Sequence, residues 1–228
     1  ISAGFDNINH IIGSIGTDTL TGLDFNSTWN ILDSAGNGRY TTEGRVLEFS
    51  AIENLVSGIG DDFVIFADGG KLPGVFNSID AKGGKDTLDY SAYTTQIQVY
   101  LAGGVSTGVT GGVSGFENVI GSLTGGSIIH GDNNNNIFVL GSGTSVIAGS
   151  GGDDTYIFTA ITFGNITIDE KTGSGIDLID FTAATSGITL NLSTLGVAEN
   201  IYGNGTLTVT VWGVFDTILG TAFADSIT

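Results

Sequence analysis

Aspartate residues in glycine-rich turns are the residues of this chain best suited to chemistry. Degenerate matches to the nine-residue pattern G-G-x-G-x-D-x-U-x, in which U is a large apolar residue, cover residues 13–21, 57–65, 81–89, 149–157, 172–180 and 220–228. In this pattern, turn carbonyls and aspartates bind Ca²⁺ between neighbouring turns of a parallel roll. The aspartate position of the six matches is occupied by Asp18, Asp62, Asp86, Asp154, Asp177 and Asp225.

Two of these turns carry a second aspartate next to the first, at Asp61 and Asp153. Adjacent carboxylates in glycine-rich turns suit a hard cation such as Ca²⁺. The sequence therefore predicts calcium as a cofactor, and the candidate ligands are Asp61, Asp62, Asp153, Asp154, Asp177, Asp18, Asp86 and Asp225. The alternative is that these aspartates cap turns through their own backbone amides, as Asx residues do.

The ionisable residues are strongly biased towards acids. The 228 residues include 24 Asp and Glu against 6 Lys and Arg, and the formal net charge is −18. Such a surface repels nucleic acid and anionic lipid headgroups and attracts cations, so no nucleic-acid partner is expected. No apolar run approaches the ~20 residues of a membrane span, which argues against membrane insertion. The chain has no cysteine, which excludes disulfides and thiol catalysis.

The elements that must position the aspartates are short apolar runs. Residues 128–129, 137–140, 146–147 and 156–158 are too short for helices, rich in β-branched or aromatic residues, and flanked by glycine, asparagine or aspartate. Residues 97–101 and 206–212 alternate apolar and polar positions, as half-buried strands do. Residues 23–50 predict a hairpin or a bulged segment. The pattern therefore indicates an all-β protein.

Internal repeats link these runs into one architecture. Residues 86–101 align without gaps with residues 177–192, DDFVIF at 61–66 matches DDTYIF at 153–158, and FENVIGS at 116–122 returns as FDTILGT at 215–221 and more loosely at 8–14 and 52–58. We expect one continuous domain over residues 1–228. It holds two imperfect repeats of about 90–100 residues, at 61–121 and 153–220, and is truncated in mid-repeat at both ends.

The spacing of equivalent aspartates predicts how the chain winds. Asp62 and Asp86 are 24 residues apart, and Asp154 and Asp177 are 23 apart. If these residues occupy the same corner of successive coils, the fold is a parallel β-solenoid, either a β-helix or a β-roll, of about ten short coils with irregular inserts. The asparagine run 133–136 fits either an asparagine ladder or a polar turn.

The glycine- and aspartate-rich phrases carry a family resemblance. They are GKDTLDYS at 84–91, FENVIG at 116–121 and GDDTY at 152–156. The chain resembles the glycine-rich repeat regions of giant secreted bacterial surface proteins, which are relatives of the RTX repeat family. This resemblance implies a calcium-linked β-solenoid in an exported adhesin, matrix or surface-layer protein.

These observations predict a structural protein rather than an enzyme. The sequence contains no Cys-His pair, no phosphate-binding loop and no H-E-x-x-H motif. We expect a secreted structural repeat region of an adhesin, sheath or fibre at the cell surface. It stacks end to end with copies of itself or with adjoining solenoid repeats, and surface glycans are further partners. Two alternatives stay open: a carbohydrate- or ice-binding module that uses Thr-rich strands such as 206–210, and a polysaccharide-active β-helix enzyme.

Overall fold

The computed structural model describes residues 8–159, 163–202 and 207–228. All regular secondary structure in these residues is β, and most strand pairs are parallel, which confirms the all-β prediction. The described residues include no helix long and apolar enough to cross a membrane. Thr206, the first residue of one predicted strand, and residues 1–7 lie outside the described residues.

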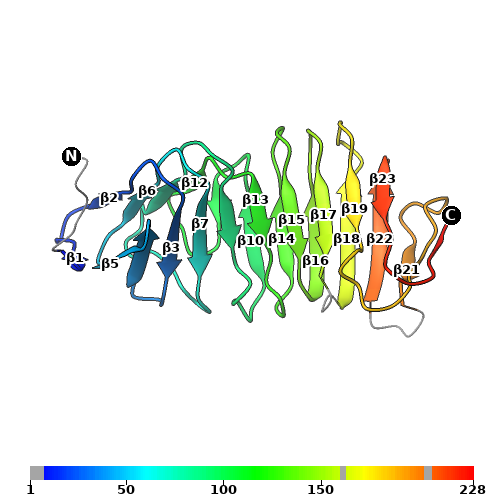
Figure 1. Cartoon of the computed structure of the whole chain (residues 1–228), viewed down its shortest axis with the longest axis horizontal. Coiled ribbons are helices and arrows are strands. Elements are labelled where there is room, and N and C mark those ends of the chain that lie inside the picture. The colour runs from blue at the N-terminus through cyan, green and yellow to red at the C-terminus, as the bar shows by residue number, and fades with distance from the viewer. Residues whose placement is uncertain (1–7, 160–162, 203–206) are drawn as a thin grey trace. The chain divides into compact units, whose positions relative to one another are not determined.

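The chain divides into two compact units. The first comprises residues 1–93 and 103–118, and the second comprises residues 94–102 and 119–228. Figure 1 colours the first unit mainly blue to cyan and the second mainly green to red.

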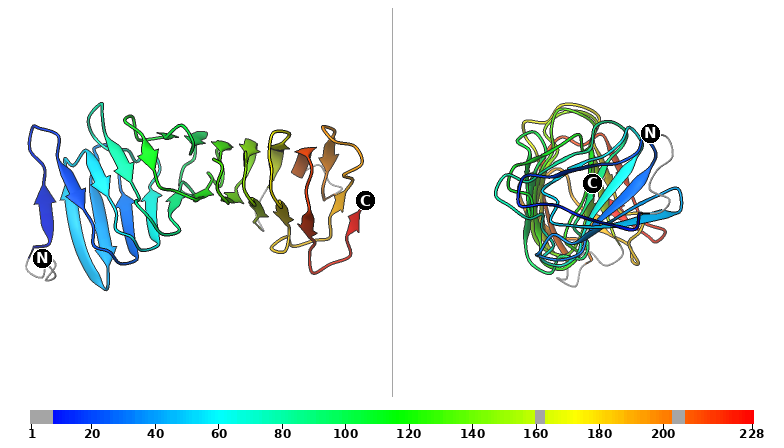
Figure 2. Two further views of the ribbon diagram at one scale, coloured as in Figure 1. Left: turned by 90° about the horizontal axis from the view of Figure 1, so that it is seen from above. Right: turned by 90° about the vertical axis from the view of Figure 1, so that its left-hand side faces the viewer.

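The first unit contains eleven strands in its described residues, and ten of them lie in two sheets. The strands are β1 (His10–Ile12), β2 (Thr19–Thr21), β3 (Ser27–Ile31), β4 (Gly38–Thr42), β5 (Arg45–Ser50), β6 (Asn54–Val56), β7 (Asp62–Phe66), β8 (Ser78–Asp80), β9 (Thr87–Asp89), β11 (Val105–Ser106) and β12 (Val113–Ser114). One sheet has the order β1-β5-β4-β3-β7-β9, and the other has the order β12-β8-β6-β2. Figure 2 shows the blue and cyan strands of this unit side by side.

The predicted insert at residues 23–50 is an antiparallel meander. β3 pairs with β4 and β4 pairs with β5, both antiparallel, whereas β3 pairs with β7 in parallel. The meander is held from inside by Trp29, Tyr40 and Phe49, which are all buried, with the Trp29 and Tyr40 ring centroids 4.2 Å apart. The hairpin prediction is therefore confirmed only in part: the segment is antiparallel, but it forms three strands, because β4 pairs with both of its neighbours. The buried aromatic residues explain why this polar segment stays attached to the sheet.

The second unit contains strands that continue the same short, parallel pattern. They are β10 (Ile97–Tyr100), β13 (Asn118–Ile120, whose first residue belongs to the first unit), β14 (Ser127–His130), β15 (Ile137–Leu140), β16 (Gly143–Ala148), β17 (Thr155–Phe158), β18 (Gly164–Glu170), β19 (Leu178–Asp180), β20 (Thr189–Leu190), β21 (Ala198–Asn200), β22 (Leu207–Gly213), β23 (Thr217–Leu219) and β24 (Ser226–Ile227). Their sheet orders are β13-β15-β17-β19-β23, β10-β14-β16-β18-β22-β21 and β20-β24.

Strands of both units alternate buried and outward-facing residues, and the buried set forms each core. In β18 and β22 every second residue is buried, including Ile166, Ile168 and Val209. Aromatic rings stack along the parallel ladders: the ring centroids of Phe158 and Phe181 lie 4.4 Å apart. Each unit therefore owes its stability mainly to apolar burial between short parallel strands.

The predicted spacing of the aspartates is confirmed locally. Parallel pairs join Phe63 to Thr87 and Thr155 to Leu178, so Asp62 and Asp86, and likewise Asp154 and Asp177, lie on neighbouring strands. The step between neighbouring strands is not constant, however. It is 18 residues from Asn136 to Asp154 and 39 from Asp177 to Asp216, because loops of different length join the strands.

Candidate functional site: the carboxylate ladders

Four of the predicted aspartates stand at the start of a strand and are buried. Asp62 is the first residue of β7, and Asp86, Asp154 and Asp177 each directly precede a strand. Their exposed fractions are at most 3%. Because an isolated buried carboxylate is costly, each of these side chains requires a hydrogen-bond partner.

In the first unit, the donor to each buried carboxylate lies on the strand that precedes it in the sheet. The Asp62 amide donates to Asp86 Oδ1 at 2.8 Å, and the Asp86 amide donates to Glu117 Oε2 at 2.9 Å. The Ser27 hydroxyl donates to Asp62 Oδ1 at 2.6 Å. We call such a series, in which one residue's amide donates to the side chain of its counterpart on the next strand, a carboxylate ladder.

The second unit repeats this arrangement. The Asn136 amide donates to Asp154 Oδ1 at 2.8 Å, the Asp154 amide to Asp177 Oδ1 at 3.0 Å, and the Asp177 amide to Asp216 Oδ2 at 3.0 Å. A buried asparagine therefore occupies the same place as the aspartates. The last member of the predicted asparagine run is part of a ladder.

The second aspartate of each predicted pair is exposed and accepts an amide from the turn before the following strand. Asp61 Oδ1 accepts the Lys85 amide at 2.8 Å, and Asp153 Oδ1 accepts the Ile176 amide at 2.8 Å. Within each pair, one carboxylate belongs to a ladder and the other accepts a separate hydrogen bond at the surface.

Asp18 and Asp225, in the first and last turns that the structure describes, close their own turns. Asp18 Oδ2 accepts the Ser14 amide at 2.5 Å, and Asp225 Oδ2 accepts the Thr221 amide at 2.8 Å. Asp225 Oδ1 also accepts the Ile188 amide at 2.9 Å. Thus seven of the eight predicted residues accept a backbone amide hydrogen bond, and Asp62 accepts the Ser27 hydroxyl. Only Asp18 and Asp225 accept an amide of their own turn, as the turn-capping alternative requires.

A small residue five positions before the aspartate makes room for its carboxylate. A Cβ atom at Gly149 would overlap Asp154 Oδ2 and Glu170 Oε1, and a Cβ atom at Gly220 would overlap Asp225 Oδ2. The first glycine of the nine-residue pattern is therefore required here by side-chain packing, without any need for an ion.

Glu170 brings a further buried carboxylate to the Asp154 corner. Its Oε1 accepts the Gly149 amide at 2.8 Å and the Tyr156 hydroxyl. Asp154 Oδ2 and Glu170 Oε2 have no hydrogen-bond partner among the described residues. Two carboxyl groups thus share one buried corner, and no basic side chain of the described residues bonds to either.

Burial controls the ionisation of these groups. It raises the pKa of Asp86 to about 7, and the negative charges of Asp62 and Glu117 add to this effect. It also raises the pKa of Asp154 to about 7, with Glu170 and Asp177 contributing repulsion. The pKa values of Asp62, Glu170 and Asp177 are raised as well, mainly by burial. The ladders therefore contain carboxyl groups that retain protons near neutral pH.

The described residues hold no cluster of three or more His, Asp or Glu side chains that could bind a metal ion. The structure brings Asp62 together with Asp86 and Asp154 with Asp177, but through backbone amides. Calcium at these positions stays a prediction.

Sequence reasoning gave no role to several residues of the ladders. Glu117, Asp216 and Glu53 each follow the apolar first residue of the FENVIG-like repeats, and Glu53 Oε2 accepts the Asp18 amide at 2.9 Å. The recurrence of an acid at this position was the available signal. Glu170 lies outside the repeats that were aligned, so no pattern pointed to it.

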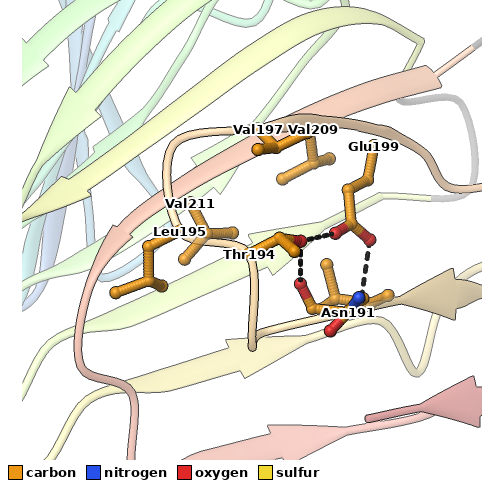
Figure 3. A pocket seen from close by; sticks show the side chains of 8 residues that line it. Asn191, Thr194, Leu195, Val197, Glu199, Val209 and Val211 are labelled. Carbon is orange, nitrogen blue, oxygen red and sulfur yellow. Dashed lines mark hydrogen bonds between the residues drawn. The ribbon is translucent and has the colours of Figure 1, made fainter.

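Neither of two surface hollows resembles a ligand site. One, shown in Figure 3, has no room for a water molecule, and Glu199 fills its polar side by accepting hydrogen bonds from the Asn191 amide and the Thr194 hydroxyl. The other, of about 280 Å³, lies beside the exposed side chains of Ile15, Val75 and Phe76. It is open and holds one charged residue, Glu53.

The Thr-rich strand β22 does not extend into a threonine array. Thr210 lies opposite Thr167, but the next residues in the same row are Val146 and Ile128. Thr208 lies opposite Asn165. A regular threonine surface, which an ice-binding face would need, is therefore only two strands deep here.

No protein-family model matches the chain, and no curated protein matches it either. Its function must therefore be inferred from the geometry of the ladders.

Removing one acceptor tests the structural role of the ladders. We expect Asp177→Ala to lower the free energy of unfolding by about 1–3 kcal/mol, because the buried Asp154 amide loses its acceptor. Asp177→Asn keeps an acceptor oxygen and should cost less than about 1 kcal/mol. Urea unfolding followed by circular dichroism measures both values, and equal losses in the two variants would contradict this role.

Proposed function

We propose that the chain is a structural repeat region of an extracellular adhesin, sheath or fibre. The observation that carries this proposal is the use of the buried acids. The carboxylates of Asp86, Asp154 and Asp177 each accept a backbone amide of a neighbouring strand, and the carboxylate of Asp62 accepts the Ser27 hydroxyl. Residues that could have formed a reactive or ligand-binding centre instead join one strand to the next.

The architecture of the proposed region is a parallel β-solenoid of the RTX-like kind. Support comes from runs of parallel pairs in which equivalent residues follow one another from strand to strand, such as Tyr156 opposite Ile179 and Ile179 opposite Ile218. Stacked repeats gain stability from contacts with their neighbours alone, so they need no disulfides, and the chain has no cysteine.

The negative net charge is the reason that the proposal includes calcium and an extracellular location. A chain with a net charge of −18 repels other copies of itself and attracts divalent cations, which are abundant outside the cell. Calcium would lower this repulsion and so favour end-to-end contact between copies or with adjoining repeats. Surface glycans are the further partner class of such an adhesin.

Electron microscopy of the purified chain, imaged with calcium and after chelation, tests this function. We expect continuous fibres in calcium that fray when the ion is removed. Magnesium at the same ionic strength is the control, since it carries the same charge but dehydrates reluctantly. Single particles at high protein concentration in every condition would contradict the fibre form of the proposal.

A further inference from the structure

A hollow on the first unit lies over the shortest of three neighbouring turns. β6 pairs with β2 on one edge and with β8 on the other, so the turns before these strands lie next to one another. The turn before β6 spans only residues 51–53, whereas the turns before β2 and β8 span residues 13–18 and 67–77. The short turn therefore forms a floor between two longer turns, and the hollow of about 280 Å³ has described residues on both sides.

The walls of this hollow are apolar and exposed. Ile15 lies on the wall before β2, and Val75 and Phe76 lie on the wall before β8. The exposed fraction is 73% for Val75 and 83% for Phe76, and Ile15 is fully exposed. Exposed apolar side chains that gather around one hollow, unlike isolated ones, mark an interaction site.

The wall before β8 is held in place from inside by one asparagine. Asn77 is 1% exposed, and its Nδ2 donates to the carbonyl oxygens of Leu72 and Pro73, both at 2.9 Å. Its Oδ1 accepts the Thr110 amide at 2.7 Å. The loop therefore presents its two exposed apolar side chains in an ordered form, and a partner does not have to order them on binding.

Glu53 is the charged residue among the described residues that line the hollow. Its Oε2 accepts the Asp18 amide at 2.9 Å, and its Cγ lies against Gly74, where an added Cβ would come to 3.0 Å. The carboxylate is therefore fixed between the two walls. No basic side chain of the described residues forms an ion pair with it.

Apolar walls around a single carboxylate are complementary to a basic side chain. Lysine and arginine bury their aliphatic stems along apolar surface and keep the charged head at a polar group. A cationic head also interacts favourably with an aromatic ring, which Phe76 supplies. The hollow is too small and too open to enclose a drug-sized molecule, which is why it does not resemble a small-molecule site. One side chain of another protein needs no such enclosure.

We propose that this hollow binds a basic segment of another protein, which inserts one arginine or lysine side chain between Ile15 and Phe76 with its cationic head at Glu53. The net charge of −18 supports this occupant, because it attracts basic partners and repels a second copy, nucleic acid and anionic lipid. A glycan fits less well, since its hydroxyl groups would meet mostly apolar walls. This binding role goes beyond the proposed structural function and does not depend on it.

Methyl NMR of the full chain tests the site with N-acetyl-arginine amide as the probe. We expect the probe to shift the methyl signals of Ile15 and Val75 and to leave that of Ile176, which is exposed in the second unit, unchanged. The citrulline analogue has nearly the same shape without the charge, and methylguanidinium has the head without the stem. Both should bind at least about fivefold more weakly. Equal shifts at all exposed methyl groups, or equal affinity for the citrulline analogue, overturn the proposal.

Two pairs of variants assign the binding to the hollow. Glu53→Gln keeps an acceptor for the Asp18 amide and should weaken binding of the arginine probe about fivefold. Glu43→Gln makes the same charge change in the exposed turn between β4 and β5 and should alter binding less than about twofold. Phe76→Ala should weaken binding, whereas Phe25→Ala, which removes another exposed ring, should not. Thermal melting checks that each variant is folded, and equal effects within either pair overturn the proposal.

A competition experiment decides the class of partner. The competitors are a glycine-serine peptide with one central arginine and a trimer of glucosamine, which carries cationic groups on a sugar. We expect the peptide to displace N-acetyl-arginine amide and the trimer to leave it bound. Displacement by the trimer at the same concentration as the peptide, or below it, assigns a cationic glycan to the hollow and overturns the choice of a protein. Fibre formation in the electron microscope is a separate result, so failure of this proposal leaves the structural function standing.

Discussion

The protein is expected to melt at a higher temperature at pH 5 than at pH 8. Burial raises the pKa of Asp86 and Asp154 to about 7, whereas both ionise near 3.8 in the unfolded chain. The folded chain therefore binds more protons between these values, and its stability falls as the pH rises from about 4 to about 7. Each group can contribute up to about 3 kcal/mol of this loss between pH 5 and pH 8.

A variant assigns the effect to one carboxyl group. Asp154→Asn keeps an acceptor for the Asn136 amide and removes the charge beside Glu170. We expect it to raise the melting temperature at pH 8 and to change it little at pH 5. Asn136 shows that an asparagine is accommodated at this position of a ladder. Calorimetry at the two pH values measures the effect. An equal destabilisation at both would show that the negative charge of Asp154 does not lower the stability of the folded chain at pH 8.

Gly84→Ala is the second substitution with a large expected effect. Gly84 has φ = +141°, a conformation that side chains other than glycine rarely adopt, and an added Cβ would overlap the carbonyl oxygen of Gly60 on the neighbouring turn. Backbone strain and overpacking together should lower the free energy of unfolding by roughly 2–5 kcal/mol. Chemical denaturation measures this loss.

The adjacent glycine is a matched control. A Cβ at Gly83 would meet no atom within 4 Å, and its φ is not in the left-handed region. Gly83→Ala should therefore change the free energy of unfolding by less than about 1 kcal/mol and can stabilise the chain by restricting its unfolded state. Similar losses in the two variants would mean that the close approach of Gly84 to Gly60 does not limit the fold.

Much of the local structure could be predicted from the sequence. Runs such as 137–140 and 156–158 are strands because they combine β-branched and aromatic residues with turn formers on both sides. The alignment of Asp62 with Asp86 followed from repetition alone. Repeats reveal which residues are equivalent, and in a stacked parallel structure equivalent residues become neighbours.

The partners of the acids could not be predicted. A glycine-rich turn with an aspartate is the same in sequence whether the carboxylate meets an ion or a backbone amide, because both interactions use the same oxygens. The choice depends on the position of the next strand, for example the 2.8 Å approach of the Asp62 amide to Asp86. Glu170 was missed for a related reason, since it reaches the Asp154 corner through a strand whose register sequence alone does not specify.

The ladders have a consequence for how the chain acquires its structure. Their bonds join residues only 18 to 39 positions apart, as between Asn136 and Asp154 and between Asp177 and Asp216. Contacts of such short range allow ordering to begin at one turn and to propagate to the next. A chain that emerges gradually from a narrow exit can therefore fold as it appears, because the ladder bonds of the described turns need only the next few tens of residues.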